Sequence, residues 1–199
     1  MGLDMLTPEQ KRVVTETGAL LQGHFILASG LHSQYYFQCA QICQYPRILE
    51  DICKEIVGRL ANARDIQTVI SPAIGGIIFG QELARLLGAR AIFTEKEAGE
   101  MVLRRGFTLK PCEKVLLAED VTTTGGSIQK VETLARAAGA EILGFTAIVD
   151  RSGGQFKASA PFVPWARLHF PTYPADALPP ELAAIPTSKP GSGKGGTSM

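Results

Sequence analysis

Two adjacent acids, Glu119 and Asp120, stand between a short apolar run and a loop rich in threonine and glycine. The run at residues 115–118, Val-Leu-Leu-Ala, is typical of a strand that is buried on both faces. Residues 122–127, Thr-Thr-Thr-Gly-Gly-Ser, follow the acids and lead into a helical pattern. A helix that begins after such a turn offers backbone N–H groups and a positive dipole end, so the loop predicts a phosphate site.

The two acids require a different partner, because carboxylates repel phosphate and accept hydrogen bonds from hydroxyl groups or bind a metal ion. A ligand with a phosphate and, nearby, two neighbouring hydroxyl groups would satisfy both parts of the stretch, and ribose 5-phosphate is such a ligand. The alternative is an ordinary strand–loop–helix connection with a polar cap. The order of strand, paired acids and threonine-rich loop favours the binding site, although the loop is neither a Walker A loop nor a Gly-x-Gly-x-x-Gly loop.

Length and composition exclude several classes of protein. A chain of 199 residues with 45% hydrophobic residues is expected to form a globular domain. A net charge of +1 does not favour binding to bulk nucleic acid or to an anionic membrane surface. No apolar run approaches the roughly 20 residues of a membrane span, and the polar start is not that of a signal peptide.

The four cysteines form no Cys-x-x-Cys pair and do not cluster in sequence with the histidines. A zinc site or a disulfide is the weaker interpretation, and reduced, unpaired thiols in a cytoplasmic protein are expected.

Helical and apolar extended patterns alternate between residues 46 and 149, which predicts an α/β fold with a central, mostly parallel sheet flanked by helices. We expect one domain over residues 1–185, with a small hood formed mainly by residues 20–42 and part of 155–175. Residues 168–170 are the last strand candidate. Residues 186–199 are of low complexity and are predicted to be disordered.

A second glycine-containing loop, Ser-Pro-Ala-Ile-Gly-Gly at residues 71–76, follows a short strand at 68–70 and opens a helix. It is either a second phosphate site or a simple strand–helix turn. Arg151 follows the strand at 142–149, and such a position points into the ligand crevice of an open α/β sheet. A surface turn is the alternative for Arg151.

The stretch at residues 114–129 resembles the phosphoribosyl-diphosphate motif of the type I phosphoribosyltransferases, an apolar strand followed by two acids and a Thr-Thr-Gly type of loop. Many members have Asp where this chain has Glu119. The resemblance implies the type I phosphoribosyltransferase fold, with Glu119 and Asp120 on the ribose hydroxyls. It assigns the 5-phosphate to the loop of Val121, Thr122, Thr123, Thr124, Gly125, Gly126 and Ser127. It assigns the diphosphate to the loop of Ser71, Pro72, Ala73, Ile74, Gly75 and Gly76.

Residues 25–37 closely resemble the N-terminal base-binding segment of the orotate phosphoribosyltransferases, with an apolar pair, Ser-Gly, a few polar residues and then aromatic residues. The resemblance implies that Tyr36 and Phe37 lie beside orotate, whereas the residues alone favour core packing. It likewise implies that Arg151 and Thr123 contact the base.

Residues 95–113 stand where the family has a mobile loop that closes over the diphosphate, commonly in the neighbouring subunit's site. Lys96 matches the usual run of lysine and histidine residues. Arg104 and Arg105 are candidate substitutes for the rest, since guanidinium groups bind diphosphate as a fork. A solvated hairpin is the alternative for the whole loop.

The implied reaction joins orotate to the ribose of phosphoribosyl diphosphate and gives orotidine 5′-monophosphate and diphosphate, with Mg²⁺ as cofactor. The implied catalytic residues are Lys96, Glu119 and Asp120, and no protein ligand is assigned to the metal. The implied assembly is a homodimer in which residues 95–106 act across the interface.

Two other functions stay open at this stage. One is transfer to another base, such as a purine, and the other is a non-catalytic regulator that senses phosphoribosyl diphosphate. The second is favoured by Ala28 and Gly75, which stand where many orotate enzymes have lysine.

Overall fold

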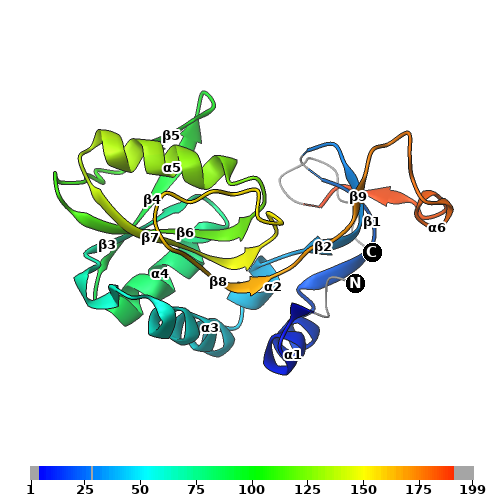
Figure 1. The fold of residues 1–199 in the computed structure, drawn as a ribbon, viewed down its shortest axis with the longest axis horizontal. Coiled ribbons are helices and arrows are strands. Elements are labelled where there is room, and N and C mark those ends of the chain that lie inside the picture. The colour runs from blue at the N-terminus through cyan, green and yellow to red at the C-terminus, as the bar shows by residue number, and fades with distance from the viewer. Residues whose placement is uncertain (1–4, 28, 191–199) are drawn as a thin grey trace. The chain divides into compact units, whose positions relative to one another are not determined.

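The computed structural model describes residues 5–27 and 29–190, and the chain forms two compact units (Figure 1). One unit comprises residues 43–168, and the other comprises residues 1–42 together with 169–199. The single domain expected over residues 1–185 therefore consists of two parts, which we describe separately.

The larger unit is built on a six-stranded sheet with the strand order β5-β4-β3-β6-β7-β8. All neighbouring strands run parallel except β4 and β5, which form an antiparallel hairpin, so the predicted mostly parallel sheet is confirmed. Its helices are α3 (Pro46–Arg59), the short 3₁₀ helix η2 (Ala63–Asp65), α4 (Gly76–Leu87) and α5 (Gly126–Ala137). Its strands are β3 (Thr68–Pro72), β4 (Arg90–Glu97), β5 (Glu100–Leu103), β6 (Lys114–Thr122), β7 (Glu141–Asp150) and β8 (Phe162–Arg167).

Helices cover both faces of this sheet, with α5 on one face and α3 and α4 on the other (Figure 1). The apolar residues Ile128, Val131 and Ala135 recur at helical spacing, so they form one face of α5. They pack in one core cluster with Val115 and Leu117 of β6, which project to the same side of the strand. The strand β6 is buried through its middle, as the apolar run predicted.

The packing places two loops at one edge of the sheet. Strands β3 and β6 are parallel neighbours, so both of their carboxyl ends point the same way. Residues 73–75 and 123–125, which follow these strands and precede α4 and α5, therefore lie at this edge. Ligand sites of open α/β sheets form at such an edge.

The smaller unit is a four-stranded sheet with the order β10-β1-β2-β9. Its elements are α1 (Pro8–Thr17), β1 (Leu20–Ile26), β2 (His32–Phe37), β9 (Thr172–Tyr173), α6 (Pro180–Ala183) and β10 (Thr187–Ser188), and α2 (Ala40–Cys43) follows β2. Within residues 20–42, the strands β1 and β2 form an antiparallel hairpin. The helix α1 begins after Thr7, whose side chain caps it in a capping box with Gln10.

Two expectations about the C-terminal third need correction. The last long strand is β8 at residues 162–167, not residues 168–170. Of the expected hood residues 155–175, residues 169–175 lie in the smaller unit and 155–168 in the larger one. Pro164 obscured this strand, but β8 is the edge of the sheet, where a missing N–H group is tolerated. Disorder does not begin at residue 186, because β10 pairs in parallel with β1. Residues 191–199 lie outside the described residues.

All four cysteines are free thiols, and Cys112 alone among them is exposed. Within residues 5–27 and 29–190, no three His, Cys, Asp or Glu side chains form a group that could hold a metal ion. No helix in that same part of the chain has the length and apolar character needed to cross a bilayer.

Glu113 connects the amino ends of β3, β4 and β6 at one edge of the sheet. Its buried carboxylate accepts hydrogen bonds from the Thr68 hydroxyl, from Nη2 of Arg90 at 2.8 Å and from the backbone N–H of Lys110 at 2.8 Å. Burial acts to raise the pKa of Glu113, but these hydrogen bonds outweigh burial and lower the pKa below 4.5. Glu113 therefore adds stability above pH 4.5, and this stability is lost as the pH falls through the lowered pKa.

We expect Glu113→Gln to reduce the free energy of unfolding by about 1–3 kcal/mol at pH 7, because it removes hydrogen bonds to a charged acceptor. The difference from the unsubstituted protein should shrink as the pH falls below 4.5. Urea denaturation at several pH values measures this, with Glu141→Gln, an exposed acid on β7, as the control. A loss that is independent of pH would contradict the charge-based account.

Candidate functional site

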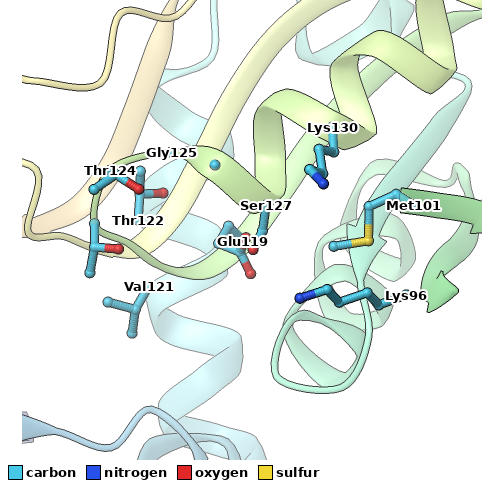
Figure 2. A pocket seen from close by; sticks show the side chains of 11 residues that line it. Lys96, Met101, Glu119, Val121, Thr122, Thr124, Gly125, Ser127 and Lys130 are labelled. Atoms are coloured by element: carbon cyan, nitrogen blue, oxygen red, sulfur yellow. The ribbon is translucent and has the colours of Figure 1, made fainter. Parts of the chain in front are cut away.

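A pocket opens at the carboxyl end of β6, between the loop that leads into α5 and the β4–β5 hairpin (Figure 2). The residues that line it come from these three elements and from the first turns of α5. They are Lys96, Met101, Glu119, Val121, Thr122, Thr123, Thr124, Gly125, Gly126, Ser127 and Lys130. The structure therefore brings together the predicted phosphate loop, the first predicted acid and Lys96.

The loop turns into α5 at Gly125, and only glycine fits there. Gly125 has a φ of 84°, which is in the left-handed region, and it forms the N-cap of α5. A Cβ atom at this position would lie 2.2 Å from the ring of Phe156. Phe156 is itself buried and packs edge-to-face against Phe145 and Phe162. The core of the larger unit thus fixes the turn that directs the helix end at the pocket.

Glu119 is the unusual group in the pocket, because this acidic residue is only 8% exposed. Burial raises the pKa of Glu119 well above its ordinary value, and the charge of Asp120 and a hydrogen bond with its side chain raise it further. Asp120 is half-buried beside it. A buried acid with a raised pKa next to a second acid marks a site where hydroxyl donors or positive charge on a ligand would favour the ionised form of Glu119.

The second predicted loop, residues 71–76, lies against Asp120. A Cβ atom at Gly75 would be 2.3 Å from Oδ2 of Asp120, so this backbone approaches the carboxylate more closely than a side chain allows. Ser71 at the start of the loop is buried, and its Oγ would lie 2.6 Å from a Cβ atom at Gly80 of α4. A side chain at Gly75 would therefore require the Asp120 carboxylate to move.

Residues 95–103 of the predicted mobile loop form the end of the β4–β5 hairpin, and its three candidate cations differ in their contacts. Lys96 lines the pocket, and its ammonium points toward Glu119 (Figure 2). Arg105 instead pairs with Glu95 at 2.9 Å, and Arg104 pairs with Glu97 at 3.5 Å. Neither arginine lines the pocket, so the structure gives no support to their predicted contact with diphosphate.

Lys130 is a pocket cation that the sequence reasoning missed. The available signal was its spacing from Ser127, because residues three apart on a helix lie on the same face. Ser127 was already assigned to the phosphate loop, so the next polar residue on its face was a candidate.

The residues predicted to contact the base are only partly assembled. Thr123 lines the pocket. The backbone N–H of Arg151 donates to the carbonyl oxygen of Thr122 at 2.7 Å, which ties the end of β7 to the phosphate loop. Tyr36 and Phe37 lie on β2 in the other unit, where the Tyr36 ring contacts Phe25 and Phe37 is buried. Their contact with a base stays a prediction, and Ala28 lies outside the described residues.

Comparison with known proteins gives consistent results. The sequence profile described as "Phosphoribosyl transferase domain" matches residues 40–174. The chain is 46% identical over 180 residues to the orotate phosphoribosyltransferase of Desulforamulus reducens, covering 90% of this chain and 94% of that protein. It is 49% identical over 185 residues to the protein of the same name from Sphingopyxis alaskensis, covering 87% and 90%. The crystal structure of orotate phosphoribosyltransferase from Aeropyrum pernix aligns with a TM-score of 0.69 at 24% identity, over 79% of this chain and 92% of that one, which shows the fold.

We expect Gly125→Ala to lower the free energy of unfolding by more than 1–2 kcal/mol, roughly the cost of a left-handed non-glycine residue, because the contact with Phe156 adds to it. Gly126→Ala is the matched control, since its Cβ atom would have only an ordinary contact, at 3.6 Å. Thermal and urea unfolding of both variants measure the difference. Equal stability of the two variants would contradict the account of the turn.

We expect Gly75→Ala and Gly75→Lys to weaken binding of phosphoribosyl diphosphate, the ligand that the sequence predicts, by about tenfold or more. A side chain at this position displaces the Asp120 carboxylate, and an added lysine does not compensate for that loss. Calorimetric titration measures the affinity, with Gly58→Ala in α3 as a control because a Cβ atom there meets no neighbour within 4 Å. Tighter binding by Gly75→Lys would show that Asp120 moves at little cost.

Proposed function

The chain belongs to the orotate phosphoribosyltransferase family, and from this membership we propose that it transfers the phosphoribosyl group of phosphoribosyl diphosphate to orotate. The products are orotidine 5′-monophosphate and diphosphate, a step of pyrimidine nucleotide synthesis. The single observation that carries the proposal is the pocket in which an acidic strand end meets a threonine- and glycine-rich helix start. The two halves of the pocket fit the hydroxyl and phosphate ends of one ribose phosphate.

The 5-phosphate is held by the loop at residues 122–127. The threonine and serine hydroxyls donate hydrogen bonds without adding charge, and the amino end of α5 adds the positive end of its dipole. The left-handed turn at Gly125 lets the backbone approach the phosphate closely.

Glu119 and Asp120 hold the ribose hydroxyls. As diphosphate departs, C1 of the ribose gains positive, oxocarbenium-like character, and the two acids stabilise that charge from a site where water is partly excluded. The raised pKa of Glu119 supports this role, since hydroxyl donors and positive charge both favour its ionised form. Orotate can lose its proton before it attacks, so the reaction needs no general base from the protein.

The leaving diphosphate is neutralised from two sides. Residues 71–76 approach it with backbone N–H groups at the start of α4. Lys96 reaches the pocket from β4 and supplies a point charge. Lys96 matches the lysine of the family's loop, so it does not substitute for the lysine that is missing at Gly75.

Mg²⁺ is the proposed cofactor, and the residues present suit a metal that arrives with its substrate. Mg²⁺ typically keeps several waters and binds substrate phosphates together with one or two carboxylates. Glu119 and Asp120 are the carboxylates that would share it. The bound ion would offset negative charge on the diphosphate.

Two further features complete the proposal. A homodimer is supported by two exposed apolar side chains close together in the chain, Ile74 in the turn before α4 and Ile78 in the first turn of α4, which are 85% and 55% exposed. Analytical ultracentrifugation tests it, and a monomer at working concentration would contradict it. A cytoplasmic location is supported by the free cysteines, and fractionation of cells that express the protein tests it.

We expect the purified protein with Mg²⁺ and phosphoribosyl diphosphate to consume orotate, measured by its loss of absorbance, and not adenine, hypoxanthine, xanthine or uracil. Asp120→Asn should lower kcat/KM on the order of 100-fold, since it removes charge that stabilises the transition state. Arg151→Ala should raise the KM for orotate about tenfold or more, since a charged hydrogen bond to the base is lost.

Asp51→Asn and Arg64→Ala, which change exposed residues of the same types, serve as controls and should leave the kinetics unchanged. Turnover of a different base would keep the phosphoribosyl site and remove the assignment of Arg151. Binding of phosphoribosyl diphosphate without turnover of any base would favour the regulator.

A further inference from the structure

We propose that Lys130 is a positioning residue that holds the β4–β5 hairpin against α5 and so places Lys96 over the phosphate pocket. The inference rests on the proposed function, because it takes Lys96 to act on the diphosphate. It assigns a role to a residue of α5 outside the phosphate loop.

The contacts of Lys130 join two elements that are distant in sequence. Its Nζ atom donates to the carbonyl oxygen of Gly99, at the turn of the hairpin, and lies 3.3 Å from Oε1 of Glu100. The Glu100 side chain is 73% exposed, so this ion pair contributes little in water. The hydrogen bond to the Gly99 carbonyl is charge-assisted and is the stronger of the two contacts.

The hairpin requires such a support because its tip extends past the parallel sheet. β3 pairs with β4 as far as Thr94, opposite Pro72. Beyond that point Lys96 lies opposite Met101 in the antiparallel ladder with β5, the edge strand. A two-stranded ribbon is marginally stable by itself.

The other ionic contacts at the tip do not reach α5. The pairs of Arg105 with Glu95 and of Arg104 with Glu97 lie within the hairpin and the residues that follow it. Met101 packs on the core cluster and anchors the base of the tip. The Lys130 hydrogen bond connects the turn of the hairpin directly to α5, the helix that follows the proposed phosphate loop.

The position of Lys96 depends on this hydrogen bond. Lys96 lies three residues before Gly99, in the strand that the hydrogen bond holds, and its ammonium points into the pocket that Lys130 also lines (Figure 2). Release of the turn would let the two-stranded tip move and would carry the Lys96 ammonium with it. A displacement of this kind weakens stabilisation of the leaving group without loss of the global fold.

A double-mutant cycle between Lys130→Met and Lys96→Met tests the proposal. Lys130→Met removes the charge and keeps the aliphatic stem. We expect it to lower kcat/KM for phosphoribosyl diphosphate about tenfold, as loss of a charge-assisted hydrogen bond predicts, and to leave the KM for orotate unchanged. In the Lys96→Met background the same change should have almost no further effect, because Lys130 acts through Lys96.

Three companion variants separate this role from others. Lys130→Arg keeps a donor of similar reach and should retain most of the activity. Glu100→Gln should change kcat/KM less than twofold, since that carboxylate is exposed. Lys54→Met, in an exposed ion pair on α3, should leave both the kinetics and the exchange rates unchanged.

Hydrogen exchange of the amides at residues 97–101 gives a readout that does not depend on activity. In Lys130→Met these amides should exchange several-fold faster without substrate, while those of β6 stay protected. Unchanged exchange rates would show that the Lys130 hydrogen bond does not hold the turn. Additive losses of kcat/KM in the double-mutant cycle would show that Lys130 does not act through Lys96. If the protein turned over no base, the exchange result would still test the Lys130 hydrogen bond, so failure of the proposed function would be distinguishable.

Discussion

The buried carboxyl group of Glu119, next to the carboxyl group of Asp120, is the constraint on which the site depends. The folded protein raises the pKa of Glu119, so it binds that proton more tightly than the unfolded chain does. Stability therefore falls as the pH rises from the unfolded pKa toward the folded one, because ionising the group costs more in the folded state. The free-energy cost of ionising Glu119 in the folded protein is tolerated where a bound ligand offsets it. Ribose hydroxyl donors and a developing positive charge on the ligand would offset that cost.

The rest of the larger unit is arranged to hold this pair next to the loop that is proposed to bind phosphate. The central strand β6 is packed by helices on both faces, so the acids at its end have little freedom. Close backbone approaches then shape both loops around them. Gly75 faces the Asp120 carboxylate and Gly125 faces the Phe156 ring, and a Cβ atom at either place would lie within 2.5 Å of its neighbour. The two loops thus owe their positions to contacts with residues that are more than thirty positions away in the sequence.

The difference between local sequence signals and contacts of residues distant in the sequence explains how much of the site could be predicted. The stretch from β6 into α5 was recognisable because its signals are local: an apolar run, paired acids and a glycine turn. Strand β8 was missed because Pro164 interrupts its pattern, and β10 was missed because only its pairing with β1, far away in the chain, makes it a strand. The partners of Arg104 and Arg105 could not be predicted either, since the register of the hairpin decides which acids they meet.

The two acids also bear on which cations the pocket offers. A Cβ atom at Gly75 would lie 2.3 Å from Oδ2 of Asp120, so the loop at 71–76 meets this carboxylate with its backbone. The positive side chains that line the pocket are Lys96 of β4 and Lys130 of α5. A lysine side chain is flexible, so its charge is well placed only when the backbone that carries it is held in position. In the described part of the chain the sheet has no strand beyond β5, and the role proposed for Lys130 follows from this need for support on the hairpin of Lys96.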